Sequence, residues 1–313
     1  MLTFIGKRVV SGIVLIWSVC TLVFVLLYFN SGNVARTILG QTASQEAVDL
    51  KSAQLGLDRP LTVQYVDWLS HALHGDLGTS WFTNQPVTST IATRLPVTLS
   101  IIIGATIVSA IIAVVLGVWA AIRRGWADRV VQVLSVLGFA VPGFLIAIGL
   151  IAVFALNFGW FAPTGFVAFT DSPSGWLRTV TLPIIALSIG GIAAISGQIR
   201  GSMLDAMRQD YVRTLRSRGL SSTQVTFVHV LRNAAGPALA VLALQFIGML
   251  GGVVLIEQIF AIPGVGQMTV LSTIQGDIPV VMGLVAVTAI LVVVVNLAID
   301  LVQGWVTPRA RLA

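Results

Sequence analysis

Six long stretches of this sequence carry no Asp, Glu, Lys or Arg and are densely apolar. A helix needs roughly 20 apolar residues to cross the hydrocarbon core of a bilayer, so each stretch predicts one transmembrane helix. Two other uncharged stretches do not qualify, because one is rich in Thr, Ser and Asn and the other contains a proline and three glycines. The predicted spans are residues 9–29, 97–122, 130–157, 180–200, 235–256 and 279–303.

The gap between Arg129 and Asp171 holds 41 uncharged residues but only one span. Turn-forming residues interrupt its second half, at Asn157, Gly159, Pro163 and Gly165. Inside the span, the pair Pro142 and Gly143 predicts a kink whose freed backbone groups are satisfied by neighbouring helices.

Composition agrees with a membrane protein. Hydrophobic residues make up 56% of the 313 residues and charged residues only 10%, against roughly 25% charged in soluble domains. Soluble enzymes, disordered chains and disulfide scaffolds are therefore excluded. The single cysteine, Cys20, excludes an intrachain disulfide and a cysteine-based zinc site. The two lysines, Lys7 and Lys51, lie in no phosphate-binding loop motif. The fold class is an all-α integral membrane protein.

The distribution of Lys and Arg sets the orientation. With the N-terminus inside, thirteen of the eighteen basic residues lie in inner segments, and four of the other five lie in one long outer segment. The chain is therefore predicted to be N-in and C-in. The basicity is explained by this topology and by contact with anionic lipid headgroups. A nucleic-acid partner is rejected, because the basic residues are spread over four separate inner segments.

The outer segment at residues 30–96 is a predicted extracytoplasmic cap loop. Helical periodicity appears at residues 45–55 and again at 61–73, and Pro60 stands where the second helix would start. A passive connector is the alternative, but the amphipathic helices favour a structured cap.

The inner segment at residues 201–234 contains a helix, a break and a second helix. Asp210 is expected to cap a short helix over residues 211–218, and Gly219 is its expected left-handed terminator. Ser221 and Gln224 then form a capping box that starts the next helix.

The short helix has two faces. Tyr211, Leu215 and Leu220 are apolar, whereas Arg213, Arg216 and Arg218 are basic. Spacing alone favours an interfacial helix whose arginines contact lipid phosphates. A docking helix for a cytosolic partner is the second interpretation.

The inner segment resembles a known family, and so does most of the chain. Asp210-Tyr211-Val212-Arg213-Thr214, Arg218-Gly219-Leu220, His229, Arg232-Asn233-Ala234 and Pro237 are similar to the EAA loop of peptide permeases. Matching segments in the same order are Leu55–Pro60, Gly75–Ser80, Arg94–Leu99, Glu257–Phe260, Pro263–Gly266, Asp300-Leu301 and Pro308-Arg309. The chain is identified as similar to the B-type permease subunit of the oligopeptide/dipeptide/nickel ABC importers.

This resemblance implies a type I ABC importer permease fold over residues 1–313, working by alternating access. It reverses the preference at the inner helix, which becomes the coupling helix inserted into a cleft of the ATPase. The implied coupling residues are Asp210, Tyr211, Arg213, Thr214, Leu215, Arg216, Arg218, Gly219 and Leu220. Leu215 departs from the small Ala usual in the family and is expected to alter the fit to the ATPase.

The resemblance also implies the partners: a second homologous permease in a heterodimer, two ATPase subunits or domains, an extracytoplasmic substrate-binding protein and the lipid membrane. ATP and magnesium would bind in the partner subunits, with no cofactor, metal or catalytic residue in this chain. The implied cargo is di- or oligopeptides. Nickel chelates, glutathione or another small solute are the alternative.

Glu257 ends the fifth span, and an ionisable group near membrane depth is a candidate functional residue. The favoured interpretation is a Glu at the water interface, bonded to the Pro/Gly turn that follows. The alternative is an outer gate at residues 258–278, with Glu257, Pro263, Gly264 and Gly266 as its candidate residues. Two other classes fit less well. An intramembrane enzyme would need a nucleophile and base, and a secondary transporter would need charged residues within its spans.

Overall fold

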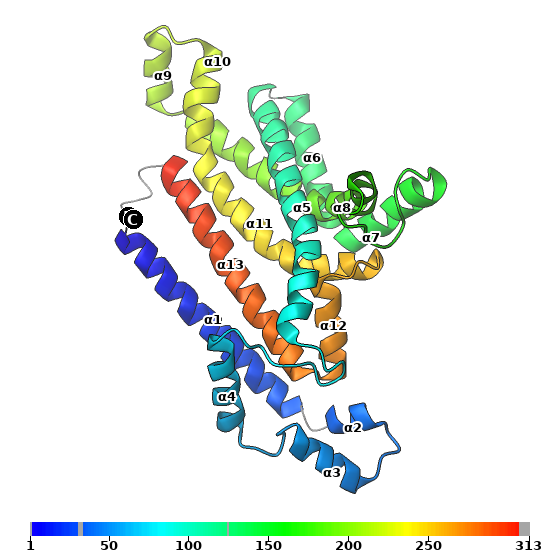
Figure 1. Cartoon of the computed structure of the whole chain (residues 1–313). Coiled ribbons are helices and arrows are strands. Elements are labelled where there is room, and N and C mark those ends of the chain that lie inside the picture. The colour runs from blue at the N-terminus through cyan, green and yellow to red at the C-terminus, as the bar shows by residue number, and fades with distance from the viewer. Residues whose placement is uncertain (1, 31–33, 124, 307–313) are drawn as a thin grey trace. The chain divides into compact units, whose positions relative to one another are not determined.

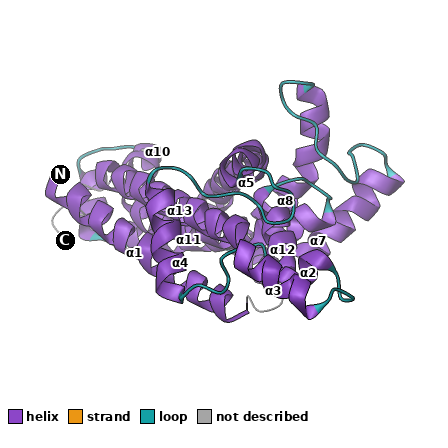
Figure 2. Ribbon diagram, turned by 60° about the horizontal axis from the view of Figure 1, so that its bottom comes forward, coloured by secondary structure: helices purple, strands orange, loops and turns teal. Residues whose placement is uncertain are grey.

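The computed structural model describes residues 2–30, 34–123 and 125–306, and it folds these residues into helices and loops (Figures 1 and 2). An isolated β-bridge joins Thr79 to Pro86. The α-helices are α1 (Leu2–Asn30), α2 (Val34–Leu39), α3 (Gln45–Gln54), α4 (Leu61–Leu73), α5 (Val87–Arg123), α6 (Trp126–Ala140), α7 (Gly143–Leu150), α8 (Pro173–Met207), α9 (Asp210–Ser217), α10 (Ser222–Gln224), α11 (Leu231–Ile259), α12 (Val265–Gln275) and α13 (Ile278–Val306). Two π-helical segments, η2 (Ile151–Asn157) and η3 (Val225–Val230), continue α7 and precede α11.

Five helices in the described residues are long and apolar enough to cross a membrane, and a bent pair makes a sixth if it is one span. These helices contain five of the six predicted spans, and the bent pair contains the remaining one, 130–157. The expectation of an all-α membrane protein is confirmed.

The third span differs from its prediction. Instead of one kinked helix, residues 128–140 and 143–157 form two helical segments bent by 97°. The residue before a proline is pushed out of the helical region, and Val141 is extended, with φ −92° and ψ 118°. Pro142 then stands at the N-terminal cap of α7. The proline therefore ends one helix and starts another.

Most long helices extend beyond their predicted spans. α5 begins at Val87, ten residues before the predicted start, and α8 covers 173–207 instead of 180–200. Charged residues mark where a helix leaves the hydrocarbon, but the backbone hydrogen-bond ladder continues past them. Arg94 lies inside α5 for this reason.

Two helices of the cap loop form where the periodicity placed them, as α3 and α4. Ser44 caps α3 by accepting a hydrogen bond from the Ala47 amide, and Pro60 precedes α4. The short helix α2 was not predicted. The tail motif Pro308-Arg309 lies outside the described residues.

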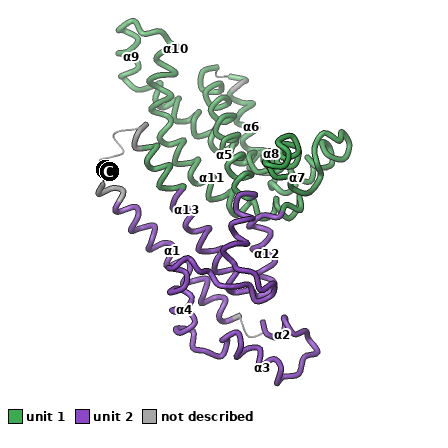
Figure 3. The backbone as a smooth tube through the Cα atoms, viewed as in Figure 1, with its two compact units in different colours: residues 1, 98–262, 295–313 green, residues 2–97, 263–294 purple. Residues whose placement is uncertain are grey.

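The chain divides into two compact units (Figure 3). Unit 2 comprises residues 2–97 and 263–294, and therefore contains α1 to α4, α12 and the first part of α13. In this unit α1 approaches α13 closely, because a Cβ at Gly12 would lie 2.5 Å from a methyl group of Val293. Its core is built from Cys20, Phe24, Ile278, Met282 and Ala286, with a second cluster around Val87 and Leu284.

Unit 1 comprises residues 98–262 together with 295–313, of which 307–313 are not described. It contains most of α5, the broken third span, and α8 to α11. α8 packs against α6, α7 and α11. Gly117 allows α5 to approach α8, because a Cβ there would lie 2.8 Å from Ile199.

Candidate functional site

The inner segment of unit 1 forms the expected helix, break and second helix. α9 ends in a Schellman motif, in which two backbone amides after the helix bond back to its last turn. The Gly219 amide donates to the Arg216 carbonyl over 3.0 Å, and the Leu220 amide donates to the Leu215 carbonyl over 3.3 Å. Gly219 has a φ of +85°, which favours glycine strongly over other residues. The predicted left-handed terminator is confirmed.

The prediction for the start of α9 is wrong. Asp210 is the first residue inside the helix, and Gln209 occupies the cap position without a side-chain hydrogen bond. The Asp210 backbone carbonyl accepts a hydrogen bond from the Thr214 hydroxyl over 3.1 Å. Asp210 still places a carboxylate in the first turn, where it interacts favourably with the helix dipole.

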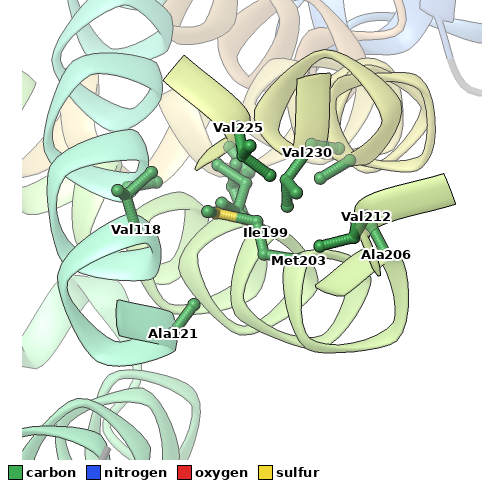
Figure 4. Packing of buried hydrophobic residues seen from close by; sticks show 12 residues of the cluster. Val118, Ala121, Ile199, Met203, Ala206, Val212, Val225 and Val230 are labelled. Atoms are coloured by element: carbon green, nitrogen blue, oxygen red, sulfur yellow. The ribbon is translucent and has the colours of Figure 1, made fainter. Parts of the chain in front are cut away.

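α9 is anchored to the rest of unit 1 by its apolar face. Val212 is buried in a cluster with residues of α5, α8, η3 and α11, including Met203 and Ala206 of α8 (Figure 4). Tyr211, Leu215 and Leu220 are partly buried against the same cluster, which we call the α9 cluster. The full set of its buried residues is Ala113, Val118, Ala121, Ile195, Ile199, Met203, Ala206, Val212, Val225, Val230, Ala234 and Ala238.

A hydrogen bond adds to this anchoring. The Asn233 side-chain amide of α11 donates to the Tyr211 hydroxyl over 2.8 Å. Leu215, whose size departs from the family pattern, packs against the α9 cluster of its own chain. The part of the Leu215 side chain that is larger than Ala is therefore at least partly buried within this chain.

The opposite face of α9 is exposed and basic. Arg213, Arg216 and Arg218 are exposed, as are Thr214 and Gly219. A helix that is fixed on one side by apolar packing and carries three arginines on the other offers a rigid, positively charged surface. The sequence placed these side chains on the correct faces, because the helical period alone determines their direction.

The second helix begins as predicted. The Ser221 hydroxyl accepts a hydrogen bond from the Gln224 amide over 3.3 Å, which confirms this half of the capping box. From Ser222 the helix runs through α10 and η3 into α11. The chain after the turn is therefore directly continuous with a membrane-spanning helix.

An ion pair that was not predicted joins α6 to α8. The Arg200 guanidinium donates two hydrogen bonds to the Asp128 carboxylate, one of them over 2.7 Å. Both side chains are largely shielded, with 24% and 20% of their surfaces exposed. The two residues are 72 positions apart in the sequence, so no local pattern predicted that they would pair. It braces α8 just before the inner segment begins.

The favoured interpretation of Glu257 is wrong in placing its side chain at a water interface. The side chain is fully buried, with 0% exposure, and accepts a hydrogen bond from the Thr98 hydroxyl of α5 over 2.5 Å. Its backbone carbonyl accepts a hydrogen bond from the Ile262 amide over 2.9 Å, at the start of the following turn. A carboxyl group at a water interface would be exposed, whereas this one is buried beside Thr98.

The four candidate gate residues fall in both units. Glu257 belongs to unit 1, whereas Pro263, Gly264 and Gly266 belong to unit 2 at the start of α12. Gly264 and Gly266 are buried and Pro263 is exposed. The gate assignment remains a prediction.

Replacing Glu257 with Leu should destabilise the chain by about 1–3 kcal/mol, because the change removes the buried acceptor of the Thr98 hydroxyl. Thr98→Val should lower the free energy of unfolding by a similar amount. The double variant should lower it by less than the sum of the two single effects, because both changes remove the same hydrogen bond. Thermal unfolding of the detergent-solubilised protein measures all three, and strictly additive effects would contradict the pairing.

Another buried carboxylate was missed, in unit 2. Asp277 is 2% exposed and accepts two hydrogen bonds, from the Ser80 hydroxyl over 2.5 Å and from the Trp81 amide over 3.2 Å. The Ser80 oxygen in turn accepts bonds from the amides of Phe82 and Thr83. We call this group the Asp277 clasp. It fastens the Gly75–Ser80 motif to the turn between α12 and α13, and no local sequence signal links these segments.

The described residues contain no group of three or more His, Cys, Asp or Glu that could hold a metal ion. His71 and His74 instead bond to backbone carbonyls of α4, over 2.8 and 2.7 Å.

Comparisons with known proteins agree along nearly the whole chain. The family model described as "Binding-protein-dependent transport system inner membrane component" matches residues 113–312. A second model, "Binding-prot-dependent transport system membrane comp, N-term", matches residues 1–102.

Two relatives and one solved structure illustrate the similarity. A protein of Brucella abortus (strain 2308), named as a peptide transport system permease protein, is 40% identical over 99% of both chains. The glutathione transport system permease protein GsiC of Salmonella choleraesuis (strain SC-B67) is 34% identical over 99% of both chains. A chain of the inward-facing MetNI methionine ABC transporter is similar in fold, with a TM-score of 0.54 and 17% identity, over 69% of this chain and 96% of that one.

Proposed function

We propose that this chain, which belongs to the family of binding-protein-dependent transport system inner membrane components, carries peptides across the membrane as one permease subunit of an ABC importer. The family and the apolar helices make it a multi-pass protein of the bacterial cytoplasmic membrane. As a permease subunit, it is not itself the ATPase.

The single observation that supports the coupling role is the geometry of α9. Its apolar face is fixed in the α9 cluster, while Arg213, Arg216 and Arg218 are exposed. A partner that binds the exposed face would displace α9 together with the α9 cluster, because the apolar side chains of α9 are packed into that cluster. Because α5, α8 and α11 all contribute residues to the α9 cluster, a displacement of α9 would move these three long helices together.

Coupling requires that the partner make different contacts with this surface in its two states. We infer that closure of two ATPase subunits or domains on ATP and magnesium moves α9, and that the spans then open outward. Hydrolysis would reset the inward-facing state. The nucleotide and the metal would be held by the partner subunits, which is consistent with the absence of a phosphate-loop motif from this sequence.

The remaining partners follow from the same proposal. A second, homologous permease would complete the translocation path as a heterodimer, and an extracytoplasmic substrate-binding protein would deliver the cargo. We assign α9 and the turn through Leu220 to the ATPase contact, and the candidate gate residues to the outer side.

Peptides are the proposed cargo because a relative that is 40% identical over 99% of both chains is named for peptide transport. Glutathione is the second candidate, because the relative named for glutathione transport is 34% identical over the same share. Glutathione is itself a small peptide derivative, so both candidates share amide and carboxylate groups.

Purification in mild detergent followed by mass spectrometry tests the proposal. A second permease and one or two ATPases should co-purify with the chain. The binding protein that belongs with them can then be titrated with dipeptides, longer peptides and glutathione in calorimetry. A chain that purifies alone, even after crosslinking at residues 211–220, would exclude the importer. A binding protein that ignores all three ligand types would exclude only the cargo.

A further inference from the structure

We propose that α4 of the outer segment lies in the outer leaflet of the bilayer, with its free apolar side against lipid, rather than in the water above the membrane. The observation that supports this inference is that α4 packs against the middle of the membrane-spanning helix α1. It concerns unit 2 alone and does not depend on ATPase docking.

The contacts between α4 and α1 lie deep along α1. The Tyr65 hydroxyl is 2.6 Å from the Thr21 hydroxyl, and the Tyr65 ring packs at a tilt of 60° against the Phe24 ring, with centroids 5.2 Å apart. Leu61 and Trp68 pack against the same buried cluster, which includes Cys20. One side of α4 is therefore seated on α1 between residues 20 and 24.

Two helices act as rulers for the depth of this contact. The apolar span of α1 ends at about residue 29, so Phe24 and Cys20 lie about 7 and 14 Å inside it at 1.5 Å per residue. The span of α13 begins at about residue 279, so Met282 and Ala286 of the same cluster lie about 5 and 11 Å inside it. Both depths fall within the outer half of a hydrocarbon core that is about 30 Å thick. The cluster, and α4 with it, is therefore at lipid depth.

The other side of α4 suits a lipid environment. Val66 and Leu73 of α4 are apolar, yet they are 60% and 79% exposed. Leu22, Leu26 and Phe29 of α1 are 61%, 61% and 79% exposed, as expected for lipid-facing residues. Exposed apolar side chains are costly in water and favourable in hydrocarbon.

Four polar side chains of α4, those of Gln64, Asp67, Ser70 and His71, lie on a third side and are bonded within the chain. The Asp67 carboxylate accepts a hydrogen bond from Arg59 over 2.5 Å, and the Gln64 side chain donates to the Arg59 carbonyl over 2.8 Å. Ser70 donates to the Asp67 carbonyl over 2.8 Å, and His71 bonds to the same carbonyl. Internal partners lower the cost of placing polar groups away from bulk water. An apolar side that can face lipid, together with a separate polar side, is typical of an interfacial helix.

The test uses spin labels on the full-length chain in vesicles of phosphatidylethanolamine and phosphatidylglycerol. Cys20 is replaced with Ala, and single cysteines are introduced as Val66→Cys and Leu73→Cys. The matched control is Glu46→Cys, on the exposed surface of α3 in the same segment. Collisions with oxygen, which dissolves in lipid, are compared with collisions with a polar nickel chelate, which does not.

The ratio of oxygen to nickel collisions at positions 66 and 73 should exceed that at position 46 by about tenfold or more, because polar solutes are excluded from hydrocarbon. Equal ratios at all three positions would place α4 in water and overturn the proposal. Protection of positions 66 and 73 from both reagents would also overturn it, because a protein surface would then cover them.

Discussion

Gly219→Asp should reduce ATP-driven uptake by about tenfold or more, which corresponds to a loss of roughly 1.4 kcal/mol of docking energy. The residue ends α9 with a φ of +85°, and Asp tolerates this conformation at a cost of about 1–2 kcal/mol. A Cβ there would meet no atom within 4 Å, so the chain should still fold and insert. The new carboxylate would lie in the exposed turn beside Arg216 and Arg218 and would disturb the basic surface offered to the ATPase. Uptake in vesicles and co-purification of the ATPase measure the effect.

Three variants separate the causes. Gly75→Asp introduces the same strain, since Gly75 follows α4 with a φ of +83° and equally open space, but it lies outside the inner segment and should leave ATPase docking unchanged. Gly219→Asn adds a side chain of similar size without a charge and should have a smaller effect. Arg213→Glu reverses an exposed charge without backbone strain and should also weaken docking of the ATPase. Retention of uptake and co-purification by both charged variants would show that α9 is not the coupling helix.

Asp277→Ala should loosen the segment between α4 and α5 and destabilise unit 2 by about 3 kcal/mol. Hydrogen bonds to a charged group contribute about 1.5–3 kcal/mol each, and Asp277 accepts two in a buried site. Without the carboxylate, the Ser80 hydroxyl and the Trp81 amide both lose a partner. Chymotrypsin should then cleave near Trp81 and Phe82 much faster than in the unchanged chain, and the unfolding temperature should fall.

Two variants serve as controls for the clasp. Asp76→Ala removes an exposed carboxylate that accepts a hydrogen bond from the Gly78 amide, and it should lower the free energy of unfolding by less than about 1 kcal/mol. Asp277→Asn keeps one acceptor oxygen and should fall between the two. If Asp277→Ala and Asp76→Ala are cleaved at the same rate, the clasp does not hold this segment in place.

Much of the fold was predictable from local signals. Runs without charge located the spans, because each charged residue placed in hydrocarbon is unfavourable by itself, whatever its neighbours are. The helices at 45–54 and 61–73 followed from their apolar period, and the end of α9 followed from one glycine. These signals act over a few residues. The exact ends of helices were less predictable, because a helix continues past the residue that leaves the membrane.

The sequence by itself determined the membrane class, the spans, the exposed and buried faces of α9 and the family. Each depends on a local property, such as hydropathy, helical period or the conformational freedom of glycine, or on motifs in a fixed order. Only the tertiary structure decided that Glu257 is buried against Thr98, that Asp277 binds Ser80, and that α4 packs on α1. These partners are 159, 197 and about 44 residues apart, so their pairing depends on how whole helices pack rather than on any local preference. The break at Pro142 depends on both the sequence and the tertiary structure. The proline predicted a kink, and the 97° bend occurs where α6 and α7 both pack against α8.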